Sequence, residues 1–357
     1  MDVFANRRPR DRADVFLTSA AQRGIERASI IEKDFWVCWT LTRIFSDIAL
    51  GRADPDDAAG APIVFKGGTS LSKAYAAIER FSEDIDLTVN RQLLGFSGQQ
   101  SDPAAQPSHG KATALLKAIS EAGRNYVSGP FLDALRQSIA TALTEDAAWS
   151  IEPDPEDRAT LVFHYPRALP PEEYDSYVAP AVRLECGARG DVWPSVAKTI
   201  RSYVAEDFPE LFNEADVVVD VLDAERTFWE KATLLHEIAH RADTDPPVLP
   251  APRLSRHYYD LARLADQPIG VGALTRVDLL SAVAAHKAAF FPRKAAHFEL
   301  ATPGTLRLLP SSDAMEQLRT DYAAMRPMFF ADPPSFEFVT DRLRRLESSI
   351  NALPPQW

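Results

Sequence analysis

Apolar residues recur at helical spacing near the start of the chain. Between residues 13 and 48 they mark one face of a predicted helical segment, a face that includes Ile30, Ile31, Phe35, Trp39 and Leu41. Residues 63–66 and 85–89 are short apolar runs typical of strands, and residues 70–79 between them predict a helix. This order of strand, helix and strand predicts a compact unit in which the helix lies against the two strands.

The remaining pattern alternates at first and then becomes helical. Three further strands are expected, at residues 161–165, 178–186 and 217–222, and a helical stretch is expected at 110–144. From residue 224 onward the pattern is almost wholly helical. The sequence therefore predicts an α+β fold, with a mixed sheet of about five strands in a domain over residues 1–222 and a mainly helical domain over residues 223–357.

Loops are expected where glycine, proline and small polar residues gather. A polar loop follows residue 48, residues 96–110 are rich in Gly, Gln, Ser and Pro, and residues 245–253 are rich in proline. A hairpin-like turn is expected around Pro303 and Gly304.

Composition and charge narrow the class of protein. The chain has 357 residues, of which 46% are hydrophobic and 25% charged, so it can bury a large core. A net charge of −12 argues against indiscriminate nucleic-acid binding, which depends on basic surface. No apolar run is long enough to span a membrane, and no secretory signal opens the chain, so we expect a cytoplasmic protein. Cys38 and Cys186 are expected to be reduced core residues.

The most informative chemistry lies between residues 64 and 89. Gly67 and Gly68 open the predicted helix and permit close approach of the backbone to a phosphate. Asp84 and Asp86 stand two residues apart on a predicted strand, so both carboxylates leave one face while Ile85 and Leu87 point into the core. Mg²⁺ is usually held by a few carboxylates together with the substrate's phosphates. The pattern predicts a magnesium-bound nucleotide and phosphoryl or nucleotidyl transfer.

The plain structural alternative is a simple turn from strand to helix followed by a solvated strand end. The sequence contains neither a phosphate-binding loop of the form G-x-x-x-x-G-K-[ST] nor a dinucleotide fingerprint. Turn, helix and paired carboxylates nevertheless occur together and in order, which favours a nucleotide site.

These segments resemble a known family, the AbiEii-type nucleotidyltransferase toxins of type IV toxin–antitoxin systems, within the polymerase-β-like superfamily. The resemblance is carried by KGGTSLSKAY (66–75) and RFSEDIDL (80–87), and further by VRLECGARGDVWP (182–194), ERTFWEKATLLH (225–236) and SRHYYDLARL (255–264). It implies transfer of NMP from a nucleoside triphosphate to an acceptor hydroxyl, with the 3′ end of tRNA as the acceptor. It also implies an AbiEi-like antitoxin as partner.

A third carboxylate would complete the metal site or act as a base. Glu185 is the candidate, because it lies in a predicted strand where an isolated charge is costly unless it is paired or metal-bound. The alternative is a salt bridge from Glu185 to Arg183 or Arg189. Many relatives carry Asp at the position that Glu185 resembles.

Further candidates are cations and hydroxyls that could contact phosphate. Lys231, on an apolar helix, can reach a triphosphate and offset charge on the leaving pyrophosphate, and Asp260 can orient it. By resemblance these two match the family's lysine and final aspartate motifs, with His257 standing where many relatives have Asp. The remaining candidate nucleotide- or phosphate-binding residues are Lys66, Gly67, Gly68, Thr69, Ser70, Lys73 and Arg189.

A competing motif is His236-Glu237-x-x-His240, a literal H-E-x-x-H on a predicted helix. Two histidines four residues apart share a face and could bind Zn²⁺, with Glu237 as general base, which would make the protein a zinc metallopeptidase. The pattern fixes only three positions, and it leaves the glycine pair and the aspartates without a purpose. A second alternative is a nucleotide-binding regulator without catalysis, although such a protein need not keep both aspartates and Lys231.

Overall fold

The computed structural model describes residues 1–48, 60–174, 178–244, 248 and 250–354. Its contacts divide the chain into two compact units. Unit 1 comprises Met1–Ala74, Phe81–Ser101 and Gln106–Leu222, and unit 2 comprises Tyr75–Arg80, Asp102–Ala105 and Asp223–Trp357. The loop expected after residue 48 and much of the proline-rich loop at 245–253 lie outside the described residues.

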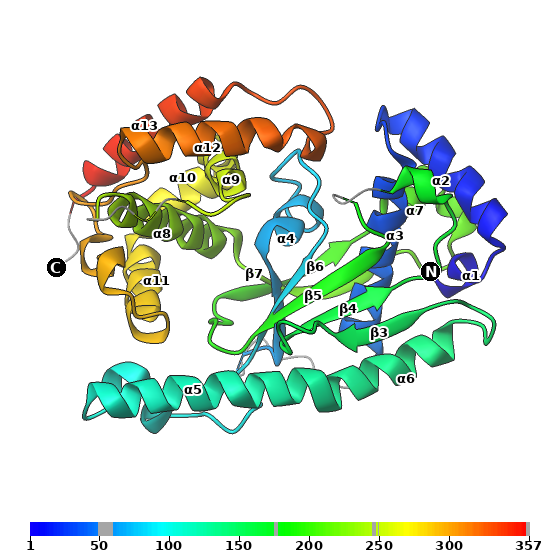
Figure 1. Ribbon diagram of the computed structural model, residues 1–357, viewed down its shortest axis with the longest axis horizontal. Helices are drawn as coiled ribbons and strands as arrows, with labels where there is room; N and C mark the ends of the chain where they lie inside the picture. The colour runs from blue at the N-terminus through cyan, green and yellow to red at the C-terminus, as the bar shows by residue number, and fades with distance from the viewer. Residues whose placement is uncertain (49–59, 175–177, 245–247, 249, 355–357) are drawn as a thin grey trace. The chain divides into compact units, whose positions relative to one another are not determined.

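Unit 1 is built around one mixed sheet, which has seven strands in the described part of the chain (Figure 1). The strands are β1 (Ile63–Lys66), β2 (Ile85–Val89), β3 (Ser150–Pro153), β4 (Thr160–His164), β5 (Ala181–Gly187), β6 (Ser195–Ile200) and β7 (Val217–Leu222). Their spatial order is β3-β4-β5-β2-β1-β7-β6. The pairs β1–β7 and β2–β5 are parallel and the other pairs are antiparallel, so the expected mixed sheet is confirmed.

The expected number of about five strands is wrong, because β3 and β6 were missed. These two strands form the edges of the sheet. In β6 four consecutive residues are exposed, and β3 ends at Pro153. Edge strands bury little, so they lack the hydrophobic pattern by which strands are recognised in a sequence.

The two faces of the sheet differ in polarity. Strand registers place Ile85 and Leu87 on the same face as Leu184 and Phe163, and all four side chains are fully buried. Helix α3 (Ala28–Thr42) packs on this face, where Trp39 stacks on Phe163 with ring centroids 5.8 Å apart. The prediction that Ile85 and Leu87 enter the core is confirmed, and polar side chains are left on the opposite face.

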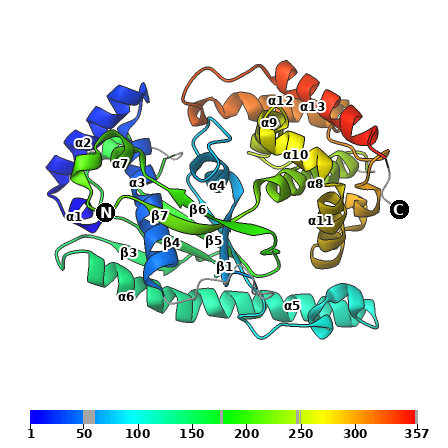
Figure 2. The same cartoon turned by 180° about the vertical axis from the view of Figure 1, so that it is seen from behind.

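The N-terminal helical segment is interrupted, whereas a single stretch was expected. It consists of α1 (Asp2–Ala5), α2 (Pro9–Arg23) and α3, visible together in Figure 2. Gly24 ends α2 in the left-handed conformation, with φ of +66°, which a glycine adopts at little cost. A π-helical turn, Arg43–Asp47, follows α3.

Helices α5 (His109–Tyr126), α6 (Leu132–Ala142) and α7 (Tyr203–Asp207) also belong to unit 1. Helices α5 and α6 are joined by a π-helical turn into one rod, so the helix expected at 110–144 is confirmed (Figures 1 and 2). Helix α7 is short. The region expected as a loop at 96–110 contains two 3-10 turns, Gln99–Ser101 and Pro103–Ala105.

Helix α4 (Gly67–Lys73) is shorter than the helix expected at 70–79. After it the chain turns, with Ala76 at a φ of +49°, and the residues Tyr75–Arg80 pack in unit 2. There the carbonyl of Ala77 accepts a hydrogen bond from Gln267. Tertiary packing therefore overrides the helical tendency of this segment.

Unit 2 is mainly helical, as expected. Its helices are α8 (Ala224–Ala242), α9 (Ser255–Ala265), α10 (Pro268–Thr275), α11 (Val277–Phe290), α12 (Ser312–Ala324) and α13 (Phe336–Asn351). The side chain of Asp223 caps α8 by accepting hydrogen bonds from the backbone N–H groups of Glu225 and Arg226. Within the described ranges no single helix has the length and apolarity to cross a membrane, although the pair α10 and α11, bent by 81°, passes that test jointly.

Both cysteines are free and buried, as expected. Burial raises the pKa of the Cys38 and Cys186 thiols above the ordinary value, so neither is a thiolate at neutral pH.

Candidate active site

Three charged residues form a row across the polar face of the sheet in unit 1. Lys66 at the end of β1 lies directly opposite Asp86 on β2, and Asp86 lies directly opposite Glu185 on β5. Residues that pair across strands share a face, so the three side chains leave the sheet on one side. The register thus brings together residues that are separated by about one hundred positions in the sequence.

Gly67 lies against the carboxylate of Asp86. A Cβ atom built on Gly67 would stand 1.9 Å from Oδ2 of Asp86, and the φ of Gly67 is +80°. Only glycine fits here, because a side chain would collide with the carboxylate and the backbone conformation is unfavourable for other residues. The glycine pair and the metal-ligand candidate are therefore immediate neighbours.

The hydroxyls of Thr69 and Ser70 hold this arrangement together. Thr69 is buried, and its hydroxyl donates a hydrogen bond of 2.6 Å to the backbone carbonyl of Asp84. Ser70 is also buried and donates to the carbonyl of Gly67 over 2.9 Å. Both hydroxyls are therefore occupied within the protein, which leaves backbone N–H groups as the donors that this turn can offer to a phosphate.

The donor chemistry of this face fits Mg²⁺. Asp84 directly precedes β2, and both Asp84 and Asp86 are half-buried. Across the ranges that the structure describes, no three His, Cys, Asp or Glu side chains come together closely enough to hold a metal ion. Mg²⁺ needs only one or two carboxylates when phosphate oxygens and water complete its shell. Asp84 and Asp86 would hold the ion in that way.

Glu185 is exposed, which corrects one premise of the sequence analysis. Because its side chain is exposed, burial does not require its charge to be paired or metal-bound. Arg183, one of the two salt-bridge partners considered for it, pairs with Asp154 at 2.9 Å. Arg189, the other, is half-buried and lies two residues beyond the end of β5. Glu185 remains a prediction as metal ligand or base.

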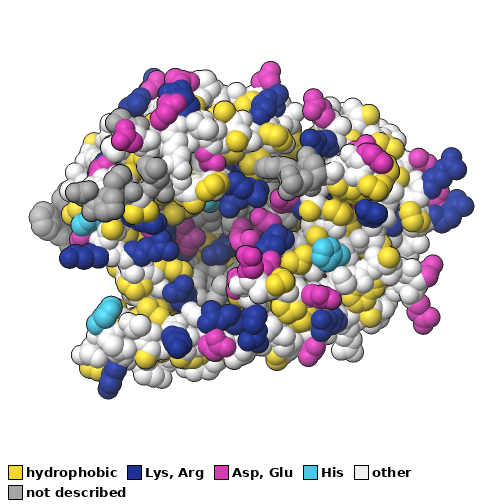
Figure 3. Space-filling model, viewed as in Figure 1, with side chains coloured by type: hydrophobic (Ala, Val, Ile, Leu, Met, Phe, Trp, Pro, Cys, Tyr) yellow, Lys and Arg dark blue, Asp and Glu magenta, His cyan; other side chains and the backbone are white. Residues whose placement is uncertain are grey.

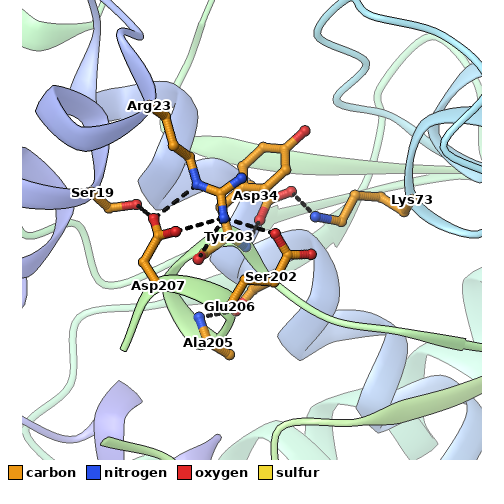
Figure 4. Close-up of polar contacts among 9 residues, drawn as sticks. All are labelled: Ser19, Arg23, Asp34, Lys73, Ser202, Tyr203, Ala205, Glu206 and Asp207. Atoms are coloured by element: carbon orange, nitrogen blue, oxygen red, sulfur yellow. Dashed lines mark hydrogen bonds and ion pairs between the residues drawn. The ribbon is translucent and has the colours of Figure 1, made fainter. Parts of the chain in front are cut away.

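Lys73, a predicted phosphate contact, lies in an ion pair instead. Its ammonium is 2.7 Å from Asp34 on α3 and 3.8 Å from the centroid of the Tyr203 ring (Figure 4). Burial by itself lowers the pKa of Lys73, but the Asp34 carboxylate outweighs burial and raises that pKa above its ordinary value. Lys73 is charged, and its charge is already matched by Asp34.

This ion pair belongs to a wider polar network that fixes the last turn of α4. Asp34 also accepts the backbone N–H of Tyr203 at the start of α7. On α2, Arg23 lies 4.4 Å from the Tyr203 ring centroid and pairs with Asp207 at 2.7 Å (Figure 4). Three helices are thereby tied to the helix that the glycine pair opens.

A second charged cluster lies in unit 2. Asp260 on α9 is fully buried and accepts hydrogen bonds of 2.7 and 2.8 Å from Arg80 and of 2.8 Å from the ammonium of Lys231 on α8. Burial raises the pKa of Asp260, but the two cations outweigh burial and hold that pKa below its usual range. The expectation that Asp260 orients Lys231 thus agrees with a direct contact between them.

Arg80 is the residue that the sequence analysis missed. It opens RFSEDIDL, a segment that carries the family resemblance, but its pairing with Asp260 depends on residues 180 positions apart and is not visible in the sequence. His257 is the fourth member of the cluster, with Nδ1 at 3.4 Å from the Lys231 ammonium. Burial and the neighbouring Lys231 lower the pKa of His257 well below its ordinary value, so its ring is neutral.

The H-E-x-x-H motif has a structural role in unit 2. Nε2 of His236 lies 3.0 Å from the carbonyl of His297, and Nδ1 accepts the backbone N–H of Arg307 over 3.0 Å. Both ring nitrogens are therefore engaged, and burial lowers the pKa of His236 to about 4. Glu237 pairs with Arg293 at 2.9 Å. This geometry contradicts the zinc-site alternative.

The surface carries charges of both signs. Figure 3 shows Lys and Arg side chains interspersed with Asp and Glu side chains over the face in view. On this face, basic residues that could meet a nucleic acid stand among acidic neighbours, in keeping with the net charge of −12.

The structure thus places a glycine-opened helix next to a strand that carries Asp86 and directly follows Asp84, within a mixed sheet. The sequence model of the family described as "Nucleotidyl transferase AbiEii toxin, Type IV TA system" matches residues 48–344. The chain therefore belongs to the AbiEii family, as its motifs indicated, and is a nucleotidyltransferase toxin of a type IV toxin–antitoxin system.

A solved structure supports the fold. MenT4, a nucleotidyltransferase toxin from Mycobacterium tuberculosis H37Rv, matches with a TM-score of 0.50 and 15% sequence identity, over 95% of this chain and 90% of that chain. No curated protein sequence matches the chain. Family membership implies a nucleoside triphosphate as substrate and an antitoxin as partner.

Proposed function

We propose that the protein transfers NMP from a nucleoside triphosphate to an acceptor hydroxyl in a magnesium-dependent reaction and releases pyrophosphate. The observation that carries this proposal is the contact between Gly67 and the Asp86 carboxylate, within the row formed by Lys66, Asp86 and Glu185. A triphosphate bound at Gly67 and Gly68 would lie next to the carboxylates that hold its Mg²⁺. Mg²⁺ would supply positive charge that stabilises the phosphate oxygens and positions the attacking oxygen.

The reaction assigns a task to each residue of the row. The acceptor oxygen forms a bond to the α-phosphorus, the bond from that phosphorus to the bridging oxygen of the β-phosphate breaks, and pyrophosphate leaves. Glu185, an exposed carboxylate on the same face as Asp86, takes the proton of the acceptor hydroxyl or serves as a further metal ligand. Lys66 adds positive charge next to Asp86. Backbone N–H groups of Gly67, Gly68, Thr69 and Ser70 contact phosphate.

Other residues contribute charge. Lys231 stabilises the negative charge that develops on the leaving pyrophosphate, and Asp260 orients its ammonium. Arg189 is a further candidate for phosphate contact. Lys73 supports the site indirectly, because its ion pair with Asp34 holds the last turn of α4.

The acceptor that we propose is the 3′ end of tRNA, and the regulator that we propose is an AbiEi-like antitoxin. Family membership and the resemblance of the motifs support both assignments. We also propose that the protein acts in the cytoplasm, where tRNA and nucleoside triphosphates are available, and that residues 1–222 and 223–357 serve as catalytic and supporting domains.

Incubation with each α-labelled nucleoside triphosphate and total RNA, with and without magnesium, tests the proposal. We expect label in a band of tRNA size only when magnesium is present, and no label with Asp86→Asn. Label transfer that is unaffected by a chelator would contradict the role of magnesium. Absence of label from every RNA would contradict the acceptor class.

A further inference from the structure

The Lys231 cluster holds more positive than negative charge. It contains two cations, Arg80 and Lys231, one carboxylate, Asp260, and the neutral ring of His257. The net charge of these four side chains is therefore about +1 at neutral pH. Burying an excess charge is costly, and such an excess is kept where an anionic ligand completes the balance.

The two cations contact the Asp260 carboxylate to different extents. Arg80 approaches Asp260 through Nε and Nη2 and so contacts both carboxylate oxygens, at 2.7 and 2.8 Å, whereas Lys231 contacts Oδ2 alone at 2.8 Å. The two-pronged contact is the stronger one. Arg80 thus makes the more extensive contact with Asp260. Since one carboxylate cannot neutralise two cations, Lys231 is the less fully paired of the two.

Of the three charged residues in the cluster, Lys231 is the one best able to contact a ligand. Its side chain keeps 7% of its surface exposed, against 2% for Arg80 and none for Asp260. Within the described part of the chain the ammonium contacts only Asp260 and, at 3.4 Å, the acceptor nitrogen of His257. An ammonium has three N–H donors, so one donor remains for a ligand.

The backbone around Arg80 is held firmly in unit 2. Arg80 forms an antiparallel bridge with Phe329, and the Phe329 ring packs on Tyr259, the neighbour of Asp260, with centroids 4.9 Å apart. The guanidinium therefore meets Asp260 from a fixed direction, which suits a positioning role rather than direct contact with substrate.

We propose that Arg80 is a positioning residue for nucleotidyl transfer: by pairing with Asp260, it leaves Lys231 with a net positive charge for a polyphosphate. This inference rests on the proposed function, since it assigns Lys231 a phosphate ligand. A purely structural role for Arg80 would depend on the presence of the arginine alone. In our proposal, the net charge of the cluster determines its affinity for triphosphate.

Binding of inorganic triphosphate to the full-length protein, measured by calorimetry with magnesium present, tests the inference without turnover. Arg80→Met removes the charge that matches Asp260, so Lys231 becomes the sole counter-ion of that carboxylate. We expect the affinity for triphosphate to fall at least ~10-fold. Arg80→Lys keeps the charge and is expected to bind within about threefold of the parent protein.

The decisive variant is the double substitution Arg80→Met with Asp260→Asn. It removes one positive and one negative charge and returns the cluster to a net charge of about +1, so affinity is expected to recover to within about threefold of the parent. Arg342→Met is the matched control, because Arg342 pairs with Asp266 at 2.6 Å in unit 2 outside the cluster. It should leave triphosphate affinity unchanged.

The possible outcomes separate a failure of the proposed function from a failure of the role assigned to Arg80. If the parent protein binds no triphosphate, the proposed function and this inference both fail. If the parent binds but Arg80→Met binds equally well, or if the double substitution fails to restore affinity, only the role of Arg80 is overturned. Should Arg80→Met not fold, Arg80→Gln retains a hydrogen-bond donor to Asp260, removes only the charge, and carries the same expectation.

Discussion

Replacing Gly67 by alanine tests the contact on which the site depends. The new Cβ would stand 1.9 Å from Oδ2 of Asp86, whereas ordinary contacts begin near 3.4 Å, so the carboxylate would have to move by about 1.5 Å (3.4 − 1.9). A displacement of this size in a catalytic group lowers the rate by about 100-fold or more. Alanine at a φ of +80° also costs about 1–2 kcal/mol of folding free energy.

The chain offers a matched control at Gly24. This glycine also has a positive φ, +66°, but a Cβ there meets nothing within 4 Å. Gly24→Ala therefore carries the conformational cost without the collision with Asp86. We expect both variants to lose about 1–2 kcal/mol in the free energy of unfolding, and only Gly67→Ala to lose nucleotidyl transfer.

The assay combines chemical unfolding with transfer of labelled NMP. The reasoning would be refuted if Gly67→Ala transferred NMP within about threefold of Gly24→Ala, because a displaced Asp86 would then be compatible with activity. A loss of transfer in both variants to the same extent would also refute it, since the contact with Asp86 would then be irrelevant.

Substitutions at Asp86, Thr69 and His236 test three other features of the structure. Asp86→Asn keeps the size of the side chain but removes its charge, so transfer should fall at least ~100-fold with an unchanged free energy of unfolding; retained activity would exclude Asp86 as a metal ligand. Thr69→Val removes the hydroxyl that donates to the Asp84 carbonyl. It should lower the free energy of unfolding, measured by chemical denaturation, by about 1–2 kcal/mol. Unchanged stability would show that the 2.6 Å hydrogen bond is not formed. His236 has a pKa of about 4 in the folded protein, against an ordinary value of 6.5. As the pH falls, the unfolded chain therefore binds a proton on this histidine before the folded protein does. The free energy of unfolding should drop by at most about 3 kcal/mol between pH 6.5 and 4. His236→Asn should remove that part of the pH dependence and exposed His164→Asn should not; identical slopes in both variants would show that His236 is not buried in its neutral form.

The pattern in the sequence predicted the elements that bury a large face. Ile85 and Leu87 alternate with half-buried Asp86 because one side of β2 is buried in the core of unit 1, and that alternation is visible in the sequence. The edge strands β3 and β6 bury little and were missed. Helix α4 ends early because residues Tyr75–Arg80 pack in unit 2, and local helix propensity does not reveal such tertiary packing.

The residues of the candidate site could likewise be predicted only in part. The two aspartates and the glycine pair lie within twenty residues and were found from their spacing. The pairing of Asp86 with Glu185 depends on the register of two parallel strands far apart in the chain, and the pairing of Arg80 with Asp260 depends on the packing of unit 2. Lys73 was assigned to phosphate because its partner, Asp34, lies on a helix that the sequence does not connect with it.

The central claim is that Asp84 and Asp86 hold a divalent cation beside the glycine turn. A crystal structure with Mn²⁺ in place of Mg²⁺ and a non-hydrolysable nucleoside triphosphate, with the ion located by its anomalous scattering, measures this directly. The account predicts a peak about 2.1 Å from carboxylate oxygens of both aspartates and from phosphate oxygens. A nucleotide bound with its metal away from both carboxylates would contradict it.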